Sequence, residues 1–197
     1  MSIVIFLGKD VNEYNEISLK TIKNAINNKK LLCEYKLAPL KIHLHYTREI
    51  KYGANKLEKA KIKIYFLICK ECERQHGHAV LPDFLSPYKQ YSADEIESVI
   101  IDSASQPVSE IDTEASESTI RRWIKHVGGR ITRAVSVLKA VFMDVGRVIA
   151  EVRLTPGHCY SELEQLLEMA PGTLKYGGNK LGLANIWLSR HNRRVYI

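Results

Sequence analysis

Cysteine is scarce in this sequence, and long runs of apolar residues are missing. The chain has four cysteines among 197 residues, at uneven spacing, which argues against a secreted fold held by disulfide bonds. Arg133, Lys139, Asp144 and Arg147 interrupt the longest apolar helical pattern, so we expect no membrane span. The apolar run Ile3 to Leu7 follows no basic segment and is shorter than the core of a signal peptide, so it predicts a first buried strand. We therefore expect a globular, cytoplasmic protein.

The two signs of charge are unevenly distributed along the chain. The net charge is +7 overall, but residues 1–75 carry +7, residues 76–120 carry −8, residues 121–153 carry +6 and residues 154–197 carry +2. The phosphates of a polyanion are bound by local clusters of Lys and Arg. The basic blocks on either side of the acidic one therefore indicate a polyanionic partner. A solvated surface of mixed sign is the alternative.

The first part of the sequence predicts one helix and a β-hairpin. Apolar residues recur at roughly helical spacing between 14 and 30, in a polar segment that should pack on one face only. Residues 41–46 and 61–68 alternate in the manner of strands, and Tyr52 to Asn55 has the composition of a turn between them. The second strand leads directly to Cys69.

Cys69 and Cys72 have the spacing of half a zinc site. Two thiolates separated by two residues can reach one tetrahedral ion, and Zn takes about four nitrogen or sulfur ligands. Cys33 lies where a first knuckle would be, but Lys36 occupies the place of its second cysteine. The candidate ligands are Cys33, Cys69, Cys72 and His76, with His78 as the alternative fourth ligand and His43 and His45 as further candidates. The other interpretation is a decayed site in which Cys33 is a small buried hydrophobe.

The middle of the chain has the pattern of a helix-turn-helix. Ser92 to Glu95 forms a capping box, which predicts a helix over 93–104. Pro107 can open a short second helix that ends near residue 112, because proline in the first turn loses no helical hydrogen bond. A third helix is expected from residue 116 or 118 to residue 127, where Gly128-Gly129 should stop it.

One face of this third helix is basic. Ile120, Trp123, Ile124 and Val127 recur at helical spacing and should face the core. The residues left outside are Ser118, Thr119, Arg121, Arg122, Lys125 and His126. Arg can make paired hydrogen bonds to guanine in the major groove, and Ser or Thr can bind phosphate near a helix start. These residues are therefore predicted to contact DNA, although a basic helix that only faces solvent would look similar.

A heptad pattern follows the two glycines. The apolar residues that recur at alternating steps of four and three are Ile131, Val135, Leu138, Phe142, Val145, Ile149 and Val152. Two interpretations stay open: a homodimer contact through 131–152, or packing against further helices expected over 159–169 and near 181–188. Cys159 is isolated in the first of these and is expected to be a core thiol.

The segment around the cysteine pair resembles the bacterial family called domain of unknown function 6431. The residues that carry the resemblance are Cys69, Lys70, Cys72, His78, Ala79, Leu81, Pro82, Asp83, Phe84, Leu85, Pro87 and Tyr88. The resemblance covers about Cys33 to Ser92, and Thr119 to Ile124 is similar to the helix-turn-helix of many transposases. Members of the family look like transposase-related zinc-ribbon proteins. The resemblance thus implies a zinc ribbon and a mobile-element ancestry.

The sequence departs from the family pattern at two places. Lys36 replaces the second cysteine of the first knuckle, and the link Gln75 to His78 is longer than usual. These two departures compensate each other if His76 replaces the lost thiolate as a metal ligand.

Together these patterns predict an α+β fold. We expect a degenerate zinc-ribbon-like domain over 1–91 that contains a small β-hairpin, a helix-turn-helix over 92–128 and a helical C-terminal region with a long helix over 129–197. The expected function is non-catalytic DNA binding, with a protein-interaction module or an inactive transposase remnant as the alternative. No small-molecule substrate is expected. An enzyme that cuts DNA would need spaced carboxylates for two metal ions, and the acidic residues after the third helix all fall in predicted helices: Asp144, Glu151, Glu162, Glu164 and Glu168.

Overall fold

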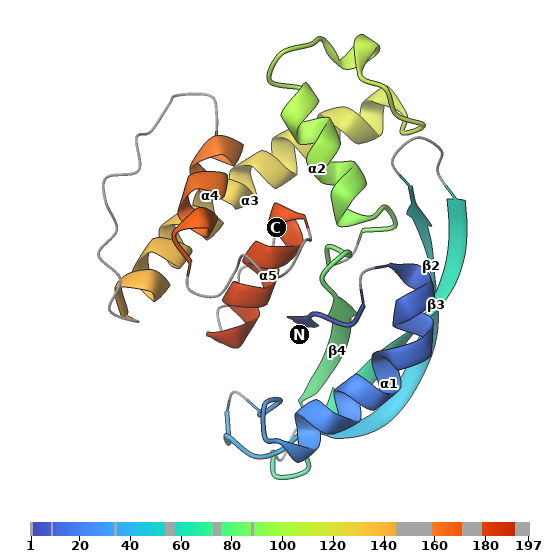
Figure 1. Ribbon diagram of the computed structural model, residues 1–197, viewed down its shortest axis with the longest axis vertical. Coiled ribbons are helices and arrows are strands. Elements are labelled where there is room, and N and C mark those ends of the chain that lie inside the picture. The colour runs from blue at the N-terminus through green and yellow to red at the C-terminus, as the bar shows by residue number, and fades with distance from the viewer. Residues whose placement is uncertain are drawn as a thin grey trace.

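The protein has an α+β fold, which confirms the predicted class (Figure 1). The computed structural model describes residues 2–8, 10–33, 35–53, 58–72, 76–87, 89–144, 159–170 and 179–191. The elements of the sheet half are β1 (Ser2–Ile5), α1 (Val11–Asn27), β2 (Lys41–Tyr52), β3 (Glu58–Ile68) and β4 (Gly77–Pro82). The helical half contains α2 (Ala93–Asp102), the 3-10 turn η1 (Val108–Glu110), α3 (Glu117–Asp144), α4 (Cys159–Glu168) and α5 (Lys180–Arg190).

The four strands form one sheet in the order β1-β4-β3-β2. β2 and β3 pair antiparallel along their whole length, so the predicted hairpin is confirmed and is longer than expected. β1 confirms the first predicted strand, and it pairs parallel with β4. β4 was not predicted, because the short run Gly-His-Ala-Val-Leu-Pro lacks the alternation that marks a half-buried strand.

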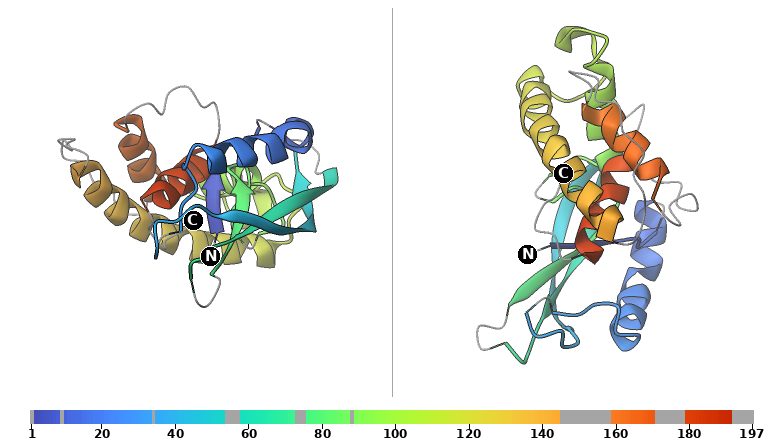
Figure 2. Two further views of the ribbon diagram at one scale, coloured as in Figure 1. Left: turned by 90° about the horizontal axis from the view of Figure 1, so that it is seen from below. Right: turned by 90° about the vertical axis from the view of Figure 1, so that its left-hand side faces the viewer.

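α1 covers one face of this sheet (Figure 2), whereas α3 packs in the helical half against α2, α4 and α5. The helix begins after Asp10, whose carboxylate accepts hydrogen bonds from the amides of Asn12 and Glu13 at 2.8 and 2.9 Å. Tyr14 is fully buried, and its hydroxyl donates to the backbone carbonyl of Lys63 in β3. The helix predicted over 14–30 is therefore right in kind but starts and ends earlier than expected.

The predicted helix-turn-helix forms only in part. Ser92 accepts a hydrogen bond from the Glu95 amide at 3.3 Å, as the capping box predicts, and α2 follows it. The prediction of a short second helix is wrong, because this segment forms only the single 3-10 turn η1. The Glu95 carboxylate does not complete the box, since it accepts a hydrogen bond from the Thr113 hydroxyl instead.

α3 runs through Gly128-Gly129 without a break, so the predicted helix end at this place is wrong. Glycine inside a helix costs about 1 kcal/mol relative to alanine. The apolar residues on both sides, Trp123, Val127 and Ile131, are at most 2% exposed, and burial of each contributes about 1.5 to 3 kcal/mol. Burial of one continuous stripe thus outweighs the local preference of the two glycines.

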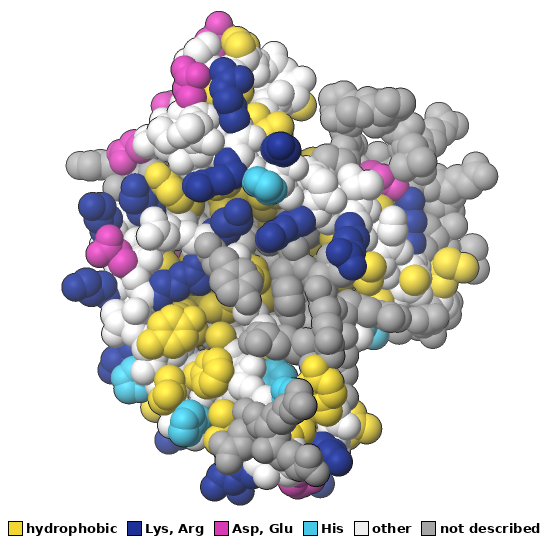
Figure 3. Space-filling model, turned by 180° about the vertical axis from the view of Figure 1, so that it is seen from behind, with side chains coloured by type: hydrophobic (Ala, Val, Ile, Leu, Met, Phe, Trp, Pro, Cys, Tyr) yellow, Lys and Arg dark blue, Asp and Glu magenta, His cyan; other side chains and the backbone are white. Residues whose placement is uncertain are grey.

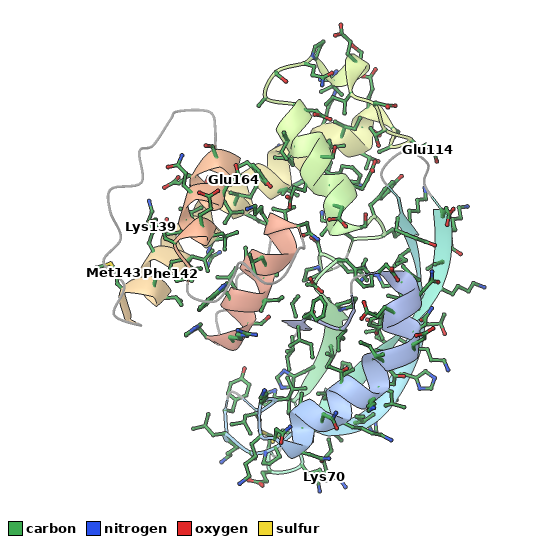
Figure 4. The ribbon with its side chains drawn as sticks, in the orientation of Figure 1. Lys70, Glu114, Lys139, Phe142, Met143 and Glu164 are labelled. Atoms are coloured by element: carbon green, nitrogen blue, oxygen red, sulfur yellow. The ribbon has the colours of Figure 1, made fainter. Side chains whose placement is uncertain are left out.

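The described half of the heptad seam packs inside the chain. Ile131, Val135, Leu138 and Phe142 are at most 2% exposed and belong to the core that α3 forms with α2, α4 and α5. Figure 4 shows Phe142 directed toward the other helices, where its ring meets that of Trp187 at 5.2 Å, whereas Met143 points away. The other seam residues, Val145, Ile149 and Val152, lie outside the described residues. No described helix combines the length and apolar character that a membrane span requires.

α5 connects the sheet half to the helical half. Ile186 belongs to the core under the sheet, while Trp187 belongs to the helical core. The Ser189 hydroxyl accepts a hydrogen bond from the Val4 amide at 2.9 Å, which ties α5 to β1. The division of the chain after residues 91 and 128 stays a prediction, and elements of all three expected parts are in contact with one another.

Candidate metal centre and nucleic-acid interface

Three cysteine thiols from distant parts of the chain come together in the sheet half. Cys33 follows α1, Cys69 comes directly after β3 and Cys72 lies in the turn that leads to β4. Their Sγ atoms all lie within 4.8 Å of one another, and the Cys33 and Cys72 sulfurs are 3.5 Å apart. All three are buried and none forms a disulfide bond. The predicted grouping of these thiols is confirmed.

Two backbone loops hold the thiols in place. The Cys33 amide donates to the Ala38 carbonyl, and the Leu37 amide donates to the Cys33 carbonyl, both at 2.8 Å. Leu37 has a positive φ of 51°, so this loop turns tightly around its cysteine. The Cys69 amide donates to the His76 carbonyl at 3.3 Å and closes the second loop. Lys70, which follows Cys69, lies at the end of the sheet remote from α2 and α3 (Figure 4).

The electrostatics of the thiols favour one thiolate and disfavour another. Burial raises the pKa of Cys33, but hydrogen bonds from the backbone of Lys36 and Tyr35 and from the other two thiols lower that pKa below its ordinary value. Burial and the neighbouring Cys33 and Cys69 raise the pKa of Cys72 to about 12. A bound cation would remove this conflict, because it stabilises the thiolate form of every ligand.

The spacing of the sulfurs suits a tetrahedral metal ion. Zn–S bonds of about 2.3 Å place the sulfurs of a tetrahedral site roughly 3.8 Å apart. The Cys33–Cys72 sulfur separation of 3.5 Å and the upper limit of 4.8 Å for all three pairs bracket that value. Three buried thiols can therefore hold one metal ion with a small adjustment.

None of the four candidate histidines supplies the fourth ligand in this structure. Among the described residues, only the three thiols form a group of metal-ligand atoms. The His76 ring stacks on the Tyr35 ring at 4.3 Å, and His78 is buried within β4. His43 and His45 lie in β2, where the His45 ring is tilted against a tyrosine of β3. Strand geometry and ring stacking thus hold the imidazoles outside the thiol group.

The predicted DNA contacts lie on the first turns of α3. Ser118, Arg121, Arg122, Lys125 and His126 are all exposed, so the predicted direction of this helix face is confirmed. Thr119 is half-buried, and its hydroxyl lies 3.0 Å from the Ser116 hydroxyl. The one ion pair of this face among the described residues joins Arg121 to Glu117 at 3.3 Å, and both side chains are more than half exposed.

The basic face extends beyond the predicted residues. Because α3 continues past Gly129, Arg130 and Arg133 are exposed on the same side of the helix. The stretch Ser118–Met143 contains no Asp or Glu, a sequence signal for the longer basic face. Lys89 joins this face from the loop before α2: burial lowers its pKa, and so do the nearby charges of Arg130 and Arg122. Periodicity alone could not have found Lys89.

A stack of side chains fixes this helix to the sheet. Trp123 of α3 meets the Tyr91 ring at 4.8 Å and 77°. The Lys51 ammonium of β2 lies 4.8 Å from the centre of the same ring and donates to the Tyr91 hydroxyl at 3.1 Å, an arrangement that combines a cation–π contact with a hydrogen bond. The basic face is therefore held in a defined position relative to β2.

Residues 32–123 match the family described as Domain of unknown function (DUF6431). This part of the chain belongs to that family. The match includes all three clustered cysteines and the first turn of the basic helix face. No curated protein and no solved structure matches the chain.

Proposed function

We propose that this protein binds DNA through the exposed face of α3 and does not cut it. The observation that carries this proposal is the row of cations on that face, with no acidic residue between Glu117 and Asp144. Phosphates are bound by local clusters of Lys and Arg. Figure 3 shows a band of Lys and Arg side chains across the side of the molecule opposite to α1, as such an interface requires.

The dimensions of α3 fit a groove of DNA. Its 28 residues span about 42 Å at 1.5 Å per residue, and the major groove of B-DNA is wide enough to admit an α-helix. The ion pair of Arg121 with Glu117 does not oppose binding, because an exposed pair is worth about 1 kcal/mol or less. Arg121 can exchange that partner for a phosphate or a guanine edge at little cost.

The proposed role of the thiol group is to hold zinc as a structural ion. Thiolate ligands select Zn and related soft ions over Mg or Ca. An ion bound by Cys33, Cys69 and Cys72 would connect the loop after α1 to the turn between β3 and β4, two segments that are far apart in sequence. A non-protein ligand such as water would complete four-coordination.

Two ion pairs of acidic side chains in α4 support the proposal that the protein binds DNA without cutting it. Glu162 pairs with Lys139 of α3 at 2.5 Å, and Glu164 lies 3.9 Å from Lys180 of α5. Carboxylates used in this way are engaged in helix packing rather than available for two-metal phosphoryl transfer. The transposase-like ancestry belongs to this proposal as well, and it rests on the resemblance described above. A nicking assay with Mg²⁺ and Mn²⁺ tests for the absence of cleavage.

The test of DNA binding begins with selection of bound sequences from a random duplex pool. The affinity for the selected duplex is then measured by fluorescence anisotropy at several salt concentrations. The variant Arg121→Ala, Arg122→Ala should bind more weakly, by about 1 to 3 kcal/mol for each base-reading arginine, and with a smaller salt dependence for each lost phosphate contact. Thermal melting verifies the fold of each variant.

A matched control removes the same charge from the other side of the molecule. Lys20 and Lys23 are exposed on α1, so Lys20→Ala, Lys23→Ala changes the net charge equally and should leave the affinity nearly unchanged. An equal loss in both double variants would mean that net charge, rather than the face of α3, attracts DNA. Wild-type affinity in the arginine variant would refute the assignment.

A further inference from the structure

The open face of the sheet contains a hollow of about 560 Å³. Two aromatic side chains border it, Tyr46 of β2 and Phe66 of β3. Tyr46 is 43% exposed, and Leu44 beside it on the same strand is 46% exposed. In Figure 3, hydrophobic side chains gather below the band of Lys and Arg. Exposed aromatic rings on a sheet are the surface on which unpaired bases of nucleic acids stack.

The position of Phe66 depends on a glycine in the neighbouring strand. A Cβ atom added at Gly77 would lie 2.2 Å from Cζ of the Phe66 ring. The ring therefore lies directly over the backbone of β4, in space that only glycine leaves free. This arrangement keeps the ring at the surface beside the hollow instead of in the core under α1.

The charges around the hollow separate a site for a base from a site for phosphates. Arg48 also borders the hollow, where burial lowers its pKa, and it makes no ion pair with any residue that the structure describes. Its guanidinium can stack on a base or bind the edge of one. Glu49 also lines the hollow, so the charges of its lining residues sum to zero, which suits an uncharged base better than a phosphate.

The hollow and the basic face of α3 are adjacent on the surface. Gln90 lines the hollow, and Lys89, which precedes it, lies near Arg122 and Arg130 of α3. The Lys51 amide donates to the Gln90 carbonyl at 2.8 Å, which fixes this segment against β2. A strand whose phosphates follow α3 would therefore reach the hollow at Lys89.

We propose that the hollow binds an unpaired base of a DNA strand whose backbone lies along Lys89 and α3. This inference rests on the proposed DNA binding by α3 and names the preferred ligand, a duplex with a single-stranded end. The base would stack between Tyr46 and Phe66, with Arg48 at its edge.

The test compares a blunt duplex with the same duplex extended by a short single-stranded overhang that contains the fluorescent base 2-aminopurine. Full-length wild-type protein should bind the extended duplex about tenfold more tightly, the usual gain from one stacked base, and binding should quench the 2-aminopurine fluorescence. Tyr46→Ala and Phe66→Leu should abolish both the gain and the quenching without changing the affinity for the blunt duplex. Tyr46→Phe keeps the ring and should retain both.

The outcomes separate this inference from the proposed role of α3. Equal binding of the blunt and extended duplexes, or a gain that Tyr46→Ala and Phe66→Leu both retain, would overturn the inference and leave α3 as the binding element. Binding of the extended duplex alone would support the hollow and overturn duplex binding by α3. Binding of neither would overturn both. If Phe66→Leu does not fold, the comparison relies on Tyr46→Ala, because the Tyr46 side chain is exposed and its truncation should leave the fold intact.

Discussion

At the scale of single residues, the three buried thiols are close enough together to bind one metal ion, and the zinc content of the protein tests this. We predict that the protein purified without chelator contains about one zinc ion per chain, and that Cys33→Ser or Cys72→Ser reduces the content to near zero. Metal affinity and folding are linked, because the ligands are assembled only in the folded chain. The variants should therefore also melt at lower temperature. Elemental analysis and thermal melting measure the two effects.

Two controls accompany the metal measurement. Cys159→Ser makes the same chemical change in α4 and should leave the zinc content unchanged. His76→Ala should also retain zinc, since the His76 ring stacks on Tyr35 outside the thiol group. Loss of zinc in His76→Ala would show that this imidazole moves to become the fourth ligand. Wild-type protein without metal would refute the site.

Asp83 should make the stability of the protein fall as pH rises. It is 6% exposed, and burial, assisted by the charge of Asp94, raises its pKa to about 7 from the value of 3.8 in the absence of the fold. The folded state thus favours the protonated carboxyl. Its contribution to the free energy of unfolding is fully present below about pH 4 and is lost as pH rises through about 7.

The variant Asp83→Asn should remove this pH dependence. Near pH 8 we expect it to be more stable than the wild type by on the order of a few kcal/mol, and the difference should shrink toward pH 5. Urea unfolding at a series of pH values measures it, and comparison at each pH cancels the contributions of Glu95 and Glu97, whose pKa values burial also raises. Exposed Asp112→Asn is the control. A constant difference across the range would contradict the prediction.

At the scale of elements, two helical glycines should respond oppositely to the same substitution. Gly129 is exposed in the middle of α3, and a Cβ atom there meets nothing within 4 Å. We expect Gly129→Ala to stabilise the protein by about 0.5 to 1 kcal/mol, because alanine has the higher helix propensity. Denaturant unfolding measures the change. A loss of stability would mean that α3 is interrupted at the glycine pair.

Gly182 of α5 is the opposite case. A Cβ atom there would lie 2.1 Å from the backbone oxygen of Asp83, and backbone cannot move aside as a flexible side chain can. Gly182→Ala should therefore destabilise the protein by about 1 to 3 kcal/mol or more, the usual cost of overpacking, because α5 must shift away from the end of β4. A neutral effect in the same unfolding measurement would show that α5 is not held this closely.

For the whole molecule, the burial of the heptad seam within the chain predicts a monomer. Ile131, Val135, Leu138 and Phe142 are already covered by helices of the same chain, so this surface is not available to a second copy. We expect light scattering at micromolar concentration to give the mass of a monomer, both free and with DNA. A dimer mass that Val135→Asp leaves intact would require a contact elsewhere. A dimer that this substitution dissociates into folded monomers would restore the seam as the interface.

The sequence alone determined the features that depend on local spacing. The β-hairpin, the capping box at Ser92, the exposed basic side of the helix after Ser116 and the family of residues 32–123 all follow from patterns within short windows. Such patterns are reliable because alternation and helical periodicity reflect which side of one element is buried. The grouping of Cys33 with Cys69 and Cys72 was also predictable, since metal-ligand spacing is a strong signal.

Only the tertiary structure decided the features that depend on contacts between distant segments. β4 is a strand because β1 and β3 supply partners on both of its edges, and Gly128-Gly129 stays helical because a continuous apolar stripe is buried on both sides of it. Lys89 joins Arg122 and Arg130, and Tyr46 and Phe66 come to border one hollow, only after the chain has folded. Local propensities are worth about 1 kcal/mol per residue, and the burial of large side chains outweighs them, so the final position of these groups is a property of the whole molecule.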